Sequence, residues 1–218
     1  MRHYVDLHLK PSTLEQAQEM VNLAHRLGYR HVASTKPPTG SDNKNTTATR
    51  IDIEARRGKE LLDALKRSRR RFDVIAVRCF SKEVARQAAK DDRVDILLFP
   101  DDPAQRKHNW LDHHEAKLVE GTGRAYEVNV SDLLATSPTH LSKVIILIKR
   151  DLAVATRHDI PVVLSSGAAT PLAMREPKAL TALASLLDVD EEYAIDMIST
   201  VPEAIIERNH TKFKKENP

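Results

Sequence analysis

The chain has 218 residues, enough for one domain with a full hydrophobic core. Its 34 Lys and Arg residues stand against 31 Asp and Glu residues, and this mild excess argues against a protein that coats nucleic acid over its whole surface. The single cysteine, Cys79, excludes an intramolecular disulfide, and no apolar run approaches the length of a membrane span. We therefore expect a cytoplasmic protein without membrane contact, in which any contact with a polyanion is local.

Six short runs rich in Val, Ile and Leu recur along the chain, with helical periodicity between them. Such nearly continuous apolar runs are typical of strands buried in a parallel sheet. The runs cover residues 4–9, 30–35, 73–80, 94–100, 125–130 and 160–166. The repeated order of strand and helix requires right-handed crossovers and a parallel sheet.

The helices between these strands have recognisable starts and ends. Ser12 and Glu15 have the spacing of a capping box, and the helical periodicity that follows ends at Gly28. Ser81 precedes a second helical pattern. After Ser166 we expect helices only, near residues 177–187, 191–199 and 202–208.

This order of elements fits both an open doubly wound sheet and a closed barrel. The chain has six glycines and no G-x-G-x-x-G or G-x-x-x-x-G-K sequence after a strand, so it lacks the phosphate loops of open nucleotide-binding sheets. An α/β fold is therefore expected, a TIM-barrel-like parallel (β/α) barrel that is irregular or incomplete. We expect one such domain over residues 1–209, a flexible charged tail over residues 210–218, and a long polar loop over residues 36–47.

Asp6 and His8 are the first candidates for a functional site. Residues two apart in a strand share a face, so both are expected to point into the barrel, while Val5, Leu7 and Leu9 point away from it. The pair could ligate a metal or form a hydrogen-bonded pair. One carboxylate and one imidazole do not supply the three or four ligands of a metal site, which favours the second interpretation.

Two further groups of residues are candidates for catalysis. His113, His114 and Glu115 are adjacent at a predicted helix start, where they face different directions, and we interpret them as a solvated helix cap. Ser165 and Ser166 end a predicted strand, the position of catalytic residues in barrel enzymes, but they lack the G-x-S-x-G context of a nucleophilic serine.

Clustered cations are the candidates for contact with RNA. Residues 55–71 contain eight Lys and Arg residues, which form either a solvated helix face or a phosphate-binding face. Other cations follow the predicted strand ends, where they would converge into a rim. With only nine aromatic residues in the chain, we expect contacts with the RNA backbone rather than with stacked bases. The candidate RNA-binding residues are Lys10, Lys36, Arg56, Arg57, Arg78 and Arg175.

Trp110 is the candidate for contact with a protein partner. It is the only tryptophan, and it lies in the irregular region 101–120. Tryptophan often anchors interfaces, but it is equally common in a core, and both interpretations remain open.

Taken in order, six segments resemble the ribonuclease P protein component 3 family of archaea and eukaryotes. They are YVDLHL at 4–9, IAVRCFS at 75–81, DILLFP at 95–100, AYEVN at 125–129, VLSSGA at 163–168 and VPEAII at 201–206. The resemblance implies a TIM-barrel-like subunit of the ribonucleoprotein that removes the 5′ leader of precursor tRNA. It also implies that the RNA performs the Mg²⁺-dependent cleavage. This chain would then be non-catalytic, hold no cofactor, support the RNA, and pair with protein component 2 among other RNase P proteins.

The family is in turn distantly similar to PHP-type metal phosphoesterases, which open with H-x-H and close with D-x-H. This chain has Asp6 and His8 in the first place and Ser-Ser-Gly at 165–167 in the second. The comparison implies that Asp6, His8, Ser165 and Ser166 form a structural remnant of a metal site. The alternative function, a PHP-type metal-dependent phosphoesterase or another small-molecule barrel enzyme, stays open.

Overall fold

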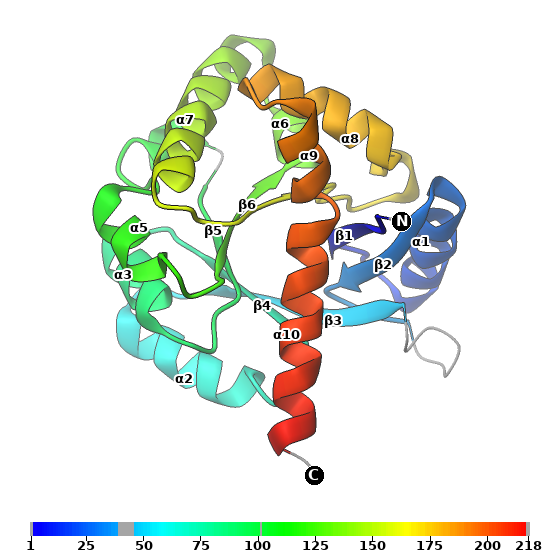
Figure 1. Ribbon diagram of the computed structural model, residues 1–218, viewed down its shortest axis with the longest axis horizontal. Helices are drawn as coiled ribbons and strands as arrows, with labels where there is room; N and C mark the ends of the chain where they lie inside the picture. Colours follow the sequence, from blue (N-terminus) through cyan, green and yellow to red (C-terminus); the bar gives the residue numbers. More distant parts are fainter. Residues whose placement is uncertain (1, 39–45, 101, 217–218) are drawn as a thin grey trace.

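Seven parallel strands follow one another in chain order around a nearly closed barrel, and most of the helices surround it (Figure 1). The computed structural model describes residues 2–38, 46–100 and 102–216, with side chains as far as residue 211. The strands are β1 (Tyr4–Leu9), β2 (Tyr29–Ser34), β3 (Thr47–Glu54), β4 (Val74–Arg78), β5 (Ile96–Leu98), β6 (Ala125–Asn129) and β7 (Val162–Ser165). The α/β barrel predicted from the sequence is confirmed.

Helices lie between most of the strands, and the elements described after β7 are all helices. Those before β7 are α1 (Leu14–Leu27), α2 (Gly58–Ser68), α3 (Lys82–Lys90), α4 (Pro103–Arg106), α5 (His113–Val119), α6 (Val130–Ala135) and α7 (Pro138–Arg157). After β7 come η1 (Pro171–Ala173), α8 (Pro177–Ala184), η2 (Ser185–Leu187), α9 (Glu191–Met197) and α10 (Thr200–Glu216). Among the described helices, none is long and apolar enough to cross a membrane.

The core has two layers, one on each face of the sheet. Alternate strand residues such as Ile75 and Val77 pack outward against the helices. The residues between them, such as Val74 and Ala76, fill the barrel interior. Ile205 and Ile206 of α10 join this inner layer.

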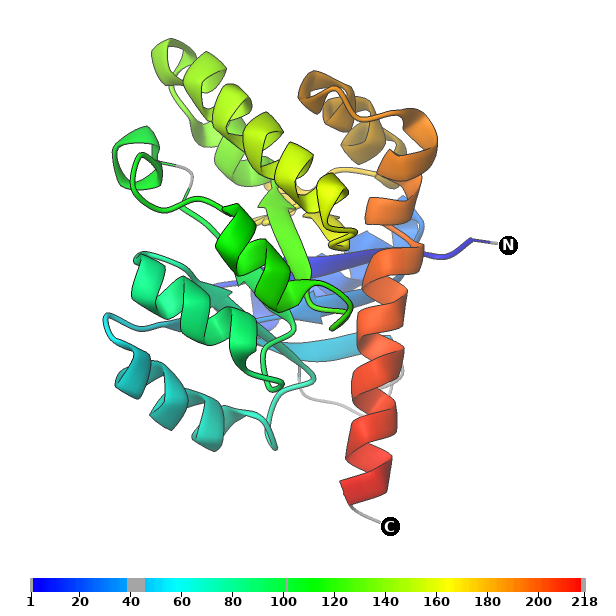
Figure 2. The ribbon, with the colours of Figure 1, turned by 60° about the vertical axis from the view of Figure 1, so that its left-hand side comes forward.

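Helix α10 lies across the amino ends of the strands. Its Asn209 donates a hydrogen bond to the carbonyl of Asp73, which precedes β4, and Arg208 donates to the carbonyl of Gly123, which precedes β6. Figure 2 shows α10 as one long helix at the side of the barrel away from most of the surrounding helices. Helix α10 thus closes the amino end of the barrel. A functional site is therefore expected at the carboxyl end.

The sequence analysis missed β3. The loop predicted over residues 36–47 therefore ends one residue too late. Thr47 already begins the strand, while residues 39–45 of that loop lie outside the described residues. Ala48 joins the inner layer and Ile53 the outer one. The inward positions that follow Ala48 are Arg50 and Asp52, so no apolar run marks the strand.

Local predictions need three corrections. Thr13, not Ser12, caps α1 and accepts from Gln16 N at 3.1 Å, although Gly28 does end this helix with a φ of 99°. The alternation expected in β1 is wrong, because Val5 and Leu7 pack in the inner layer and only Leu9 packs outward. The pairing of β1 with β2 shifts register between Asp6 and Leu9, which breaks the alternation. The segment expected to be a flexible tail continues α10 as far as Glu216, and residues 217–218 lie outside the described part.

Candidate functional site

A buried polar cluster occupies the carboxyl half of the barrel interior. Every member except Asp52, whose side chain is 16% exposed, is at most 2% exposed. The interior side chains of this cluster are His8 of β1, Arg50 and Asp52 of β3, Glu127 and Asn129 of β6, and Ser165 of β7. Asp6 and Ser166 extend the cluster between β1 and β7, where Asp6 accepts from the backbone N–H groups of His8 and Ser166.

Arg50 lies at the centre of this cluster. Its Nη1 and Nη2 donate to Glu127 Oε1 and Oε2 at 2.8 and 2.5 Å, a bidentate pair. Its Nε donates to Asp52 Oδ1 at 2.7 Å, and Nη1 also donates to the carbonyl of Leu7. The guanidinium therefore neutralises two carboxylates that the fold has removed from water.

These contacts set the charge state of the carboxylates. Burial alone would raise the pKa of both Asp52 and Glu127, but the charge of Arg50 outweighs it and holds both pKa values below the usual range. Asp6 differs, because burial raises its pKa and no cation pairs with it. Its Oδ1 accepts from the backbone N–H groups of His8 and Ser166, both at 3.1 Å, while its buried Oδ2 has no hydrogen-bond partner.

His8 makes its side-chain contacts with the other strands rather than with Asp6. Its Nδ1 donates to Asn129 Oδ1 at 2.8 Å, and its Nε2 lies 2.8 Å from Asp52 Oδ2. The expected pairing of Asp6 with His8 exists only through the backbone of His8. Ser165 supports the cluster, since its Oγ donates to Glu127 Oε1 at 2.6 Å.

The donor set of this cluster does not fit a divalent metal. Asp52 and Glu127 are paired with Arg50, and both ring nitrogens of His8 are in contact with neighbouring groups. A metal would also have to approach the fixed positive charge of the guanidinium. Among the residues that the structure describes, no group of three or more His, Cys, Asp and Glu side chains could hold a metal ion.

The group at residues 113–115 is structural. Glu115 is fully buried, so its interpretation as part of a solvated cap is wrong. Burial raises its pKa, and its Oε2 accepts from Lys82 Nζ at 3.0 Å. It forms a capping box with Asp112, the residue that caps α5. His113 is exposed, and its Nδ1 lies 3.0 Å from Nε2 of His158.

Most of the predicted RNA-binding residues lie at the carboxyl end of the barrel. They follow or end β1, β2, β3 and β4, which are consecutive in the sheet. Arg78 pairs with Glu54 at 3.1 Å, and Arg56 lines a groove of about 690 Å³ with Glu54 and Phe80. Lys10 Nζ lies 3.6 Å from Asp132 Oδ1. We name the set Lys10, Lys36, Arg56, Arg57 and Arg78 the cationic rim.

Arg175 does not belong to the cationic rim. Tyr29 Oη donates to the carbonyl of Arg175 at 2.8 Å, and Tyr29 is the first residue of β2. Arg175 therefore lies beside the amino end of that strand. Its Nη1 donates to the carbonyls of Leu172 and Met174.

Trp110 is half-buried, so it is not a core residue, and its ring already has contacts within the chain. Lys82 Nζ lies 4.4 Å and Arg150 Cζ 4.8 Å from the centroid of its ring. Two cation–π contacts therefore fix the indole between α3 and α7.

Sequence reasoning missed four members of the polar cluster, Arg50, Asp52, Glu127 and Asn129. Glu127 and Asn129 stand two apart inside an otherwise apolar run, the same signal that singled out Asp6 and His8. The sequence alone offered no comparable signal for Arg50 and Asp52, because their strand was not recognised.

A family model described as RNase P subunit p30 matches residues 3–214. The chain belongs to this family. It is thus a protein component of ribonuclease P, and the family resemblance of the six segments is confirmed. Ribonuclease P protein component 3 of Methanosarcina mazei is 29% identical over 212 residues, covering 93% of this chain and 87% of the relative.

Solved structures agree with this fold. A chain in the cryo-EM structure of archaeal ribonuclease P with mature tRNA has a TM-score of 0.78 and 20% identity, covering 95% of this chain and 93% of that one. A prolidase crystallised with N-methylphosphonate-L-proline has a TM-score of 0.59 and 10% identity, covering 95% and 74%. At these identities the likeness concerns the fold alone, a barrel resembling that of PHP-type enzymes.

Proposed function

We propose that this RNase P subunit is not itself catalytic and that it supports the catalytic RNA. The observation that carries the proposal is the ion pair of Arg50 with Glu127 and Asp52. A metal phosphoesterase of this fold would need free carboxylates and imidazoles at the carboxyl end of the barrel. Here the guanidinium neutralises the carboxylates, so the cluster stabilises the barrel instead of binding a metal.

We also propose that the cationic rim contacts ribonuclease P RNA or precursor tRNA through phosphates. The rim gathers cations from consecutive strands at one end of the molecule, the arrangement that tracks a sugar–phosphate backbone. The similar chain of known structure belongs to an archaeal ribonuclease P that holds mature tRNA, which supports an RNA-facing surface. In this proposal the chain needs no cofactor, and the holoenzyme's Mg²⁺ belongs to the RNA.

Protein partners complete the proposal. We place protein component 2 and the other RNase P proteins on the helical outside, because the barrel already buries its own strands. The region around Trp110 is the proposed contact with component 2.

A comparison of the isolated chain with the reconstituted enzyme tests the catalytic part. The purified chain is loaded with Mn²⁺ or Zn²⁺, desalted, and assayed for bound metal, for cleavage of a generic phosphodiester and for cleavage of precursor tRNA. We expect no stoichiometric metal and no cleavage, with precursor tRNA processing only after RNase P RNA and the companion proteins are added.

The contrary result has a clear signature. Cleavage by protein alone that survives repurification, and that Asp6→Ala or His8→Ala abolishes in a folded variant, would establish the alternative of a metal-dependent phosphoesterase. The fold of each variant is verified by circular dichroism, since both residues are buried in the polar cluster.

A further inference from the structure

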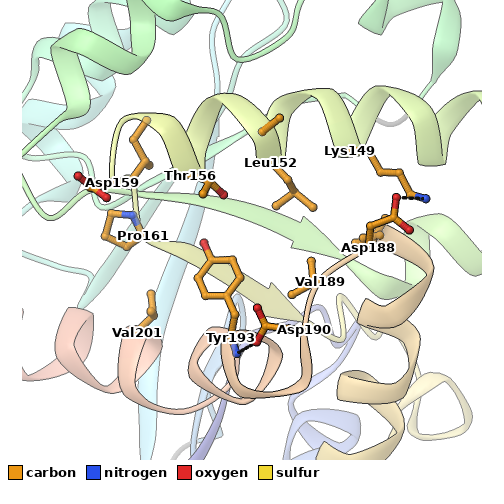
Figure 3. A pocket seen from close by; sticks show the side chains of 13 residues that line it. Lys149, Leu152, Thr156, Asp159, Pro161, Asp188, Val189, Asp190, Tyr193 and Val201 are labelled. Atoms are coloured by element: carbon orange, nitrogen blue, oxygen red, sulfur yellow. Dashed lines mark hydrogen bonds and ion pairs between the residues drawn. The ribbon is translucent and has the colours of Figure 1, made fainter.

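A groove of about 840 Å³ separates α7 from the segment that runs from η2 through α9 (Figure 3). Its lining is largely apolar, with Leu152 and Ile160 buried beneath it. Pro161, just before β7, and Val201 of α10 also line it. The groove therefore opens toward the amino end of the barrel, away from the cationic rim.

The edges of the groove are acidic. Asp159, Asp188 and Asp190 are exposed and line it. Lys149 is the only Lys or Arg among the lining residues, and its Nζ is paired with Asp188 Oδ2 at 2.8 Å. Two carboxylates are thus left without a cation from the lining.

The sequence shows that this acidity is regional. Residues 179–207 contain seven Asp and Glu residues and no Lys, Arg or His. All 34 Lys and Arg residues, with the remaining 24 acids, lie elsewhere in a chain whose net charge is +3. Figure 1 shows α9 at the top of the view and the basic helix α2 at the lower left. The segment that forms one wall of the groove is therefore acidic and lies apart from α2.

Tyr193 gives the groove a feature suited to a cationic side chain. Its half-buried ring reaches from α9 toward Thr156 and Pro161 (Figure 3). Its hydroxyl can donate a hydrogen bond at neutral pH, because a phenol with a pKa of about 10 is protonated there. A Lys or Arg side chain laid over this ring would also meet Asp190.

We propose that this groove binds a segment of a companion protein in which apolar side chains are flanked by Lys or Arg. The apolar lining takes the apolar side chains, and the acidic edges pair with the flanking cations. This inference concerns a surface other than the polar cluster and the cationic rim, and does not rest on the absence of catalysis.

Two other occupants fit the observations less well. RNA would bring its phosphates against the carboxylates of residues 159, 188 and 190, which repel them. The basic helix of a second copy would give a heterologous contact between two different surfaces of the molecule, which builds rings or open chains instead of a closed dimer. Both remain possible outcomes of the experiment.

Site-specific crosslinking identifies the occupant. The photoreactive residue p-benzoylphenylalanine replaces Ala153, which is exposed and lines the groove, in the fully reconstituted ribonuclease P. We expect a crosslink to one companion protein, within a peptide that has Lys or Arg on both sides of apolar residues. A crosslink to RNA or to a second copy, or none to any companion protein, would overturn the proposal. The same residue at Leu62 of α2, which is 37% exposed, is the control and should not yield that peptide.

A matched pair of substitutions tests the charge. Ala153→Arg and Ala153→Glu introduce long side chains at one helical position and differ in sign. We expect Ala153→Arg to weaken binding of the crosslinked protein about tenfold, and Ala153→Glu to change it much less, because only the first repels the cationic segment. Equal losses would show that charge plays no part, and two unchanged affinities would show that the groove is not the docking surface. Either result overturns the proposal, and precursor tRNA cleavage measured in parallel reports separately on the proposed function.

Discussion

Arg50 in β3 and Glu127 in β6 are joined by two hydrogen bonds across the barrel interior, and neither side chain is exposed to solvent. The two strands are not neighbours, since β4 and β5 lie between them in the sheet. The ion pair therefore ties together opposite walls of the barrel, at the position where a metal-dependent enzyme of this shape needs its ligands.

Removal of Arg50 should destabilise the protein strongly. Arg50→Met leaves Glu127 buried without its counter-charge, and the free energy of unfolding should fall by about 3–5 kcal/mol. Urea unfolding at pH 7 measures this loss. The double variant Arg50→Met, Glu127→Leu should recover much of it, because no uncompensated charge remains. Arg78→Met is the control, since its ion pair with Glu54 is 40% and 59% exposed and should contribute only about 0–1 kcal/mol. Similar losses for both single variants would contradict this account.

Asp52 and Asp6 should respond to pH with opposite signs. The pKa of Asp52 is lowered, so its stabilising contribution is present above the ordinary carboxyl pKa of about 3.9 and is lost as the pH falls through its folded value. The pKa of Asp6 is raised, so its contribution is present below about pH 3.9 and is lost as the pH rises through its folded value.

Two isosteric variants separate these effects. At pH 7 Asp52→Asn should lower the free energy of unfolding by about 1–3 kcal/mol. Asp6→Asn should leave it unchanged or raise it, because burial disfavours the charged form of Asp6 and the Asn oxygen can still accept from the backbone N–H groups of His8 and Ser166. Urea unfolding between about pH 2 and pH 8 gives both profiles, because the loss from Asp52 falls below about pH 3.9 and the loss from Asp6 above it. A loss for Asp6→Asn as large as that for Asp52→Asn at pH 7 would show that Asp6 is stabilised as a carboxylate.

Gly167 should tolerate substitution less well than Gly28, although both have positive φ. A Cβ at Gly167 would lie 2.5 Å from Ser131 Oγ and 3.0 Å from Asn129 Cβ, whereas one at Gly28 would meet nothing within 4 Å. Gly28→Ala should therefore cost about 1–2 kcal/mol of backbone strain, and Gly167→Ala should cost more, because Asn129 of the polar cluster must also move. Urea unfolding compares the two, and equal costs would show that the turn after β7 yields without disturbing the cluster.

Charge removal should distinguish the cationic rim from other surface cations. Arg56→Gln should reduce the slope of log affinity for RNase P RNA against log salt by about one unit, if Arg56 contacts one phosphate. Arg175→Gln is the matched control, because Arg175 lies beside the amino end of β2, and it should leave the slope unchanged. The affinities are measured over a KCl series with the complex of this subunit and its companions. Equal effects of the two substitutions would mean that the rim is not the RNA contact.

Trp110 should contribute to association with component 2. Trp110→Ala removes a half-buried ring held by two cations, and we expect about tenfold weaker association, the loss of one interface anchor. Calorimetric titration measures it, with circular dichroism as the check on folding. Phe72→Ala is the control, because Phe72 is also a half-buried ring with a cation beside it, Arg71 at 5.8 Å from the ring centroid, and it lies just before β4 at the amino end of the barrel. Unchanged folding together with unchanged association would exclude the Trp110 region as an interface.

Sequence periodicity was sufficient to predict a parallel α/β sheet, because strands buried on both faces require almost continuous apolar runs. The choice of a barrel rested on the missing phosphate-binding glycine loops and on the family resemblance. The rule on apolar runs also explains why β3 was missed. Arg50 and Asp52 occupy two of its inward positions, and an interior that is polar but fully paired leaves no apolar signal in the strand that lines it. The polar residues of β3 are recognised as inward-facing only in the structure, which places Glu127 opposite Arg50.

The sequence by itself determined that Asp6 and His8 belong to the first strand of a parallel sheet, because the apolar pattern of a strand is a local property of the chain. Only the tertiary structure decided what these residues contact. His8 meets Asn129 across 121 residues of sequence, and Arg50 meets Glu127 across 77. Closure of the sheet sets such pairings, and it also carries Arg175 away from the other cations. Local periodicity cannot encode them, because it indicates where a strand runs but not which strand lies across the interior.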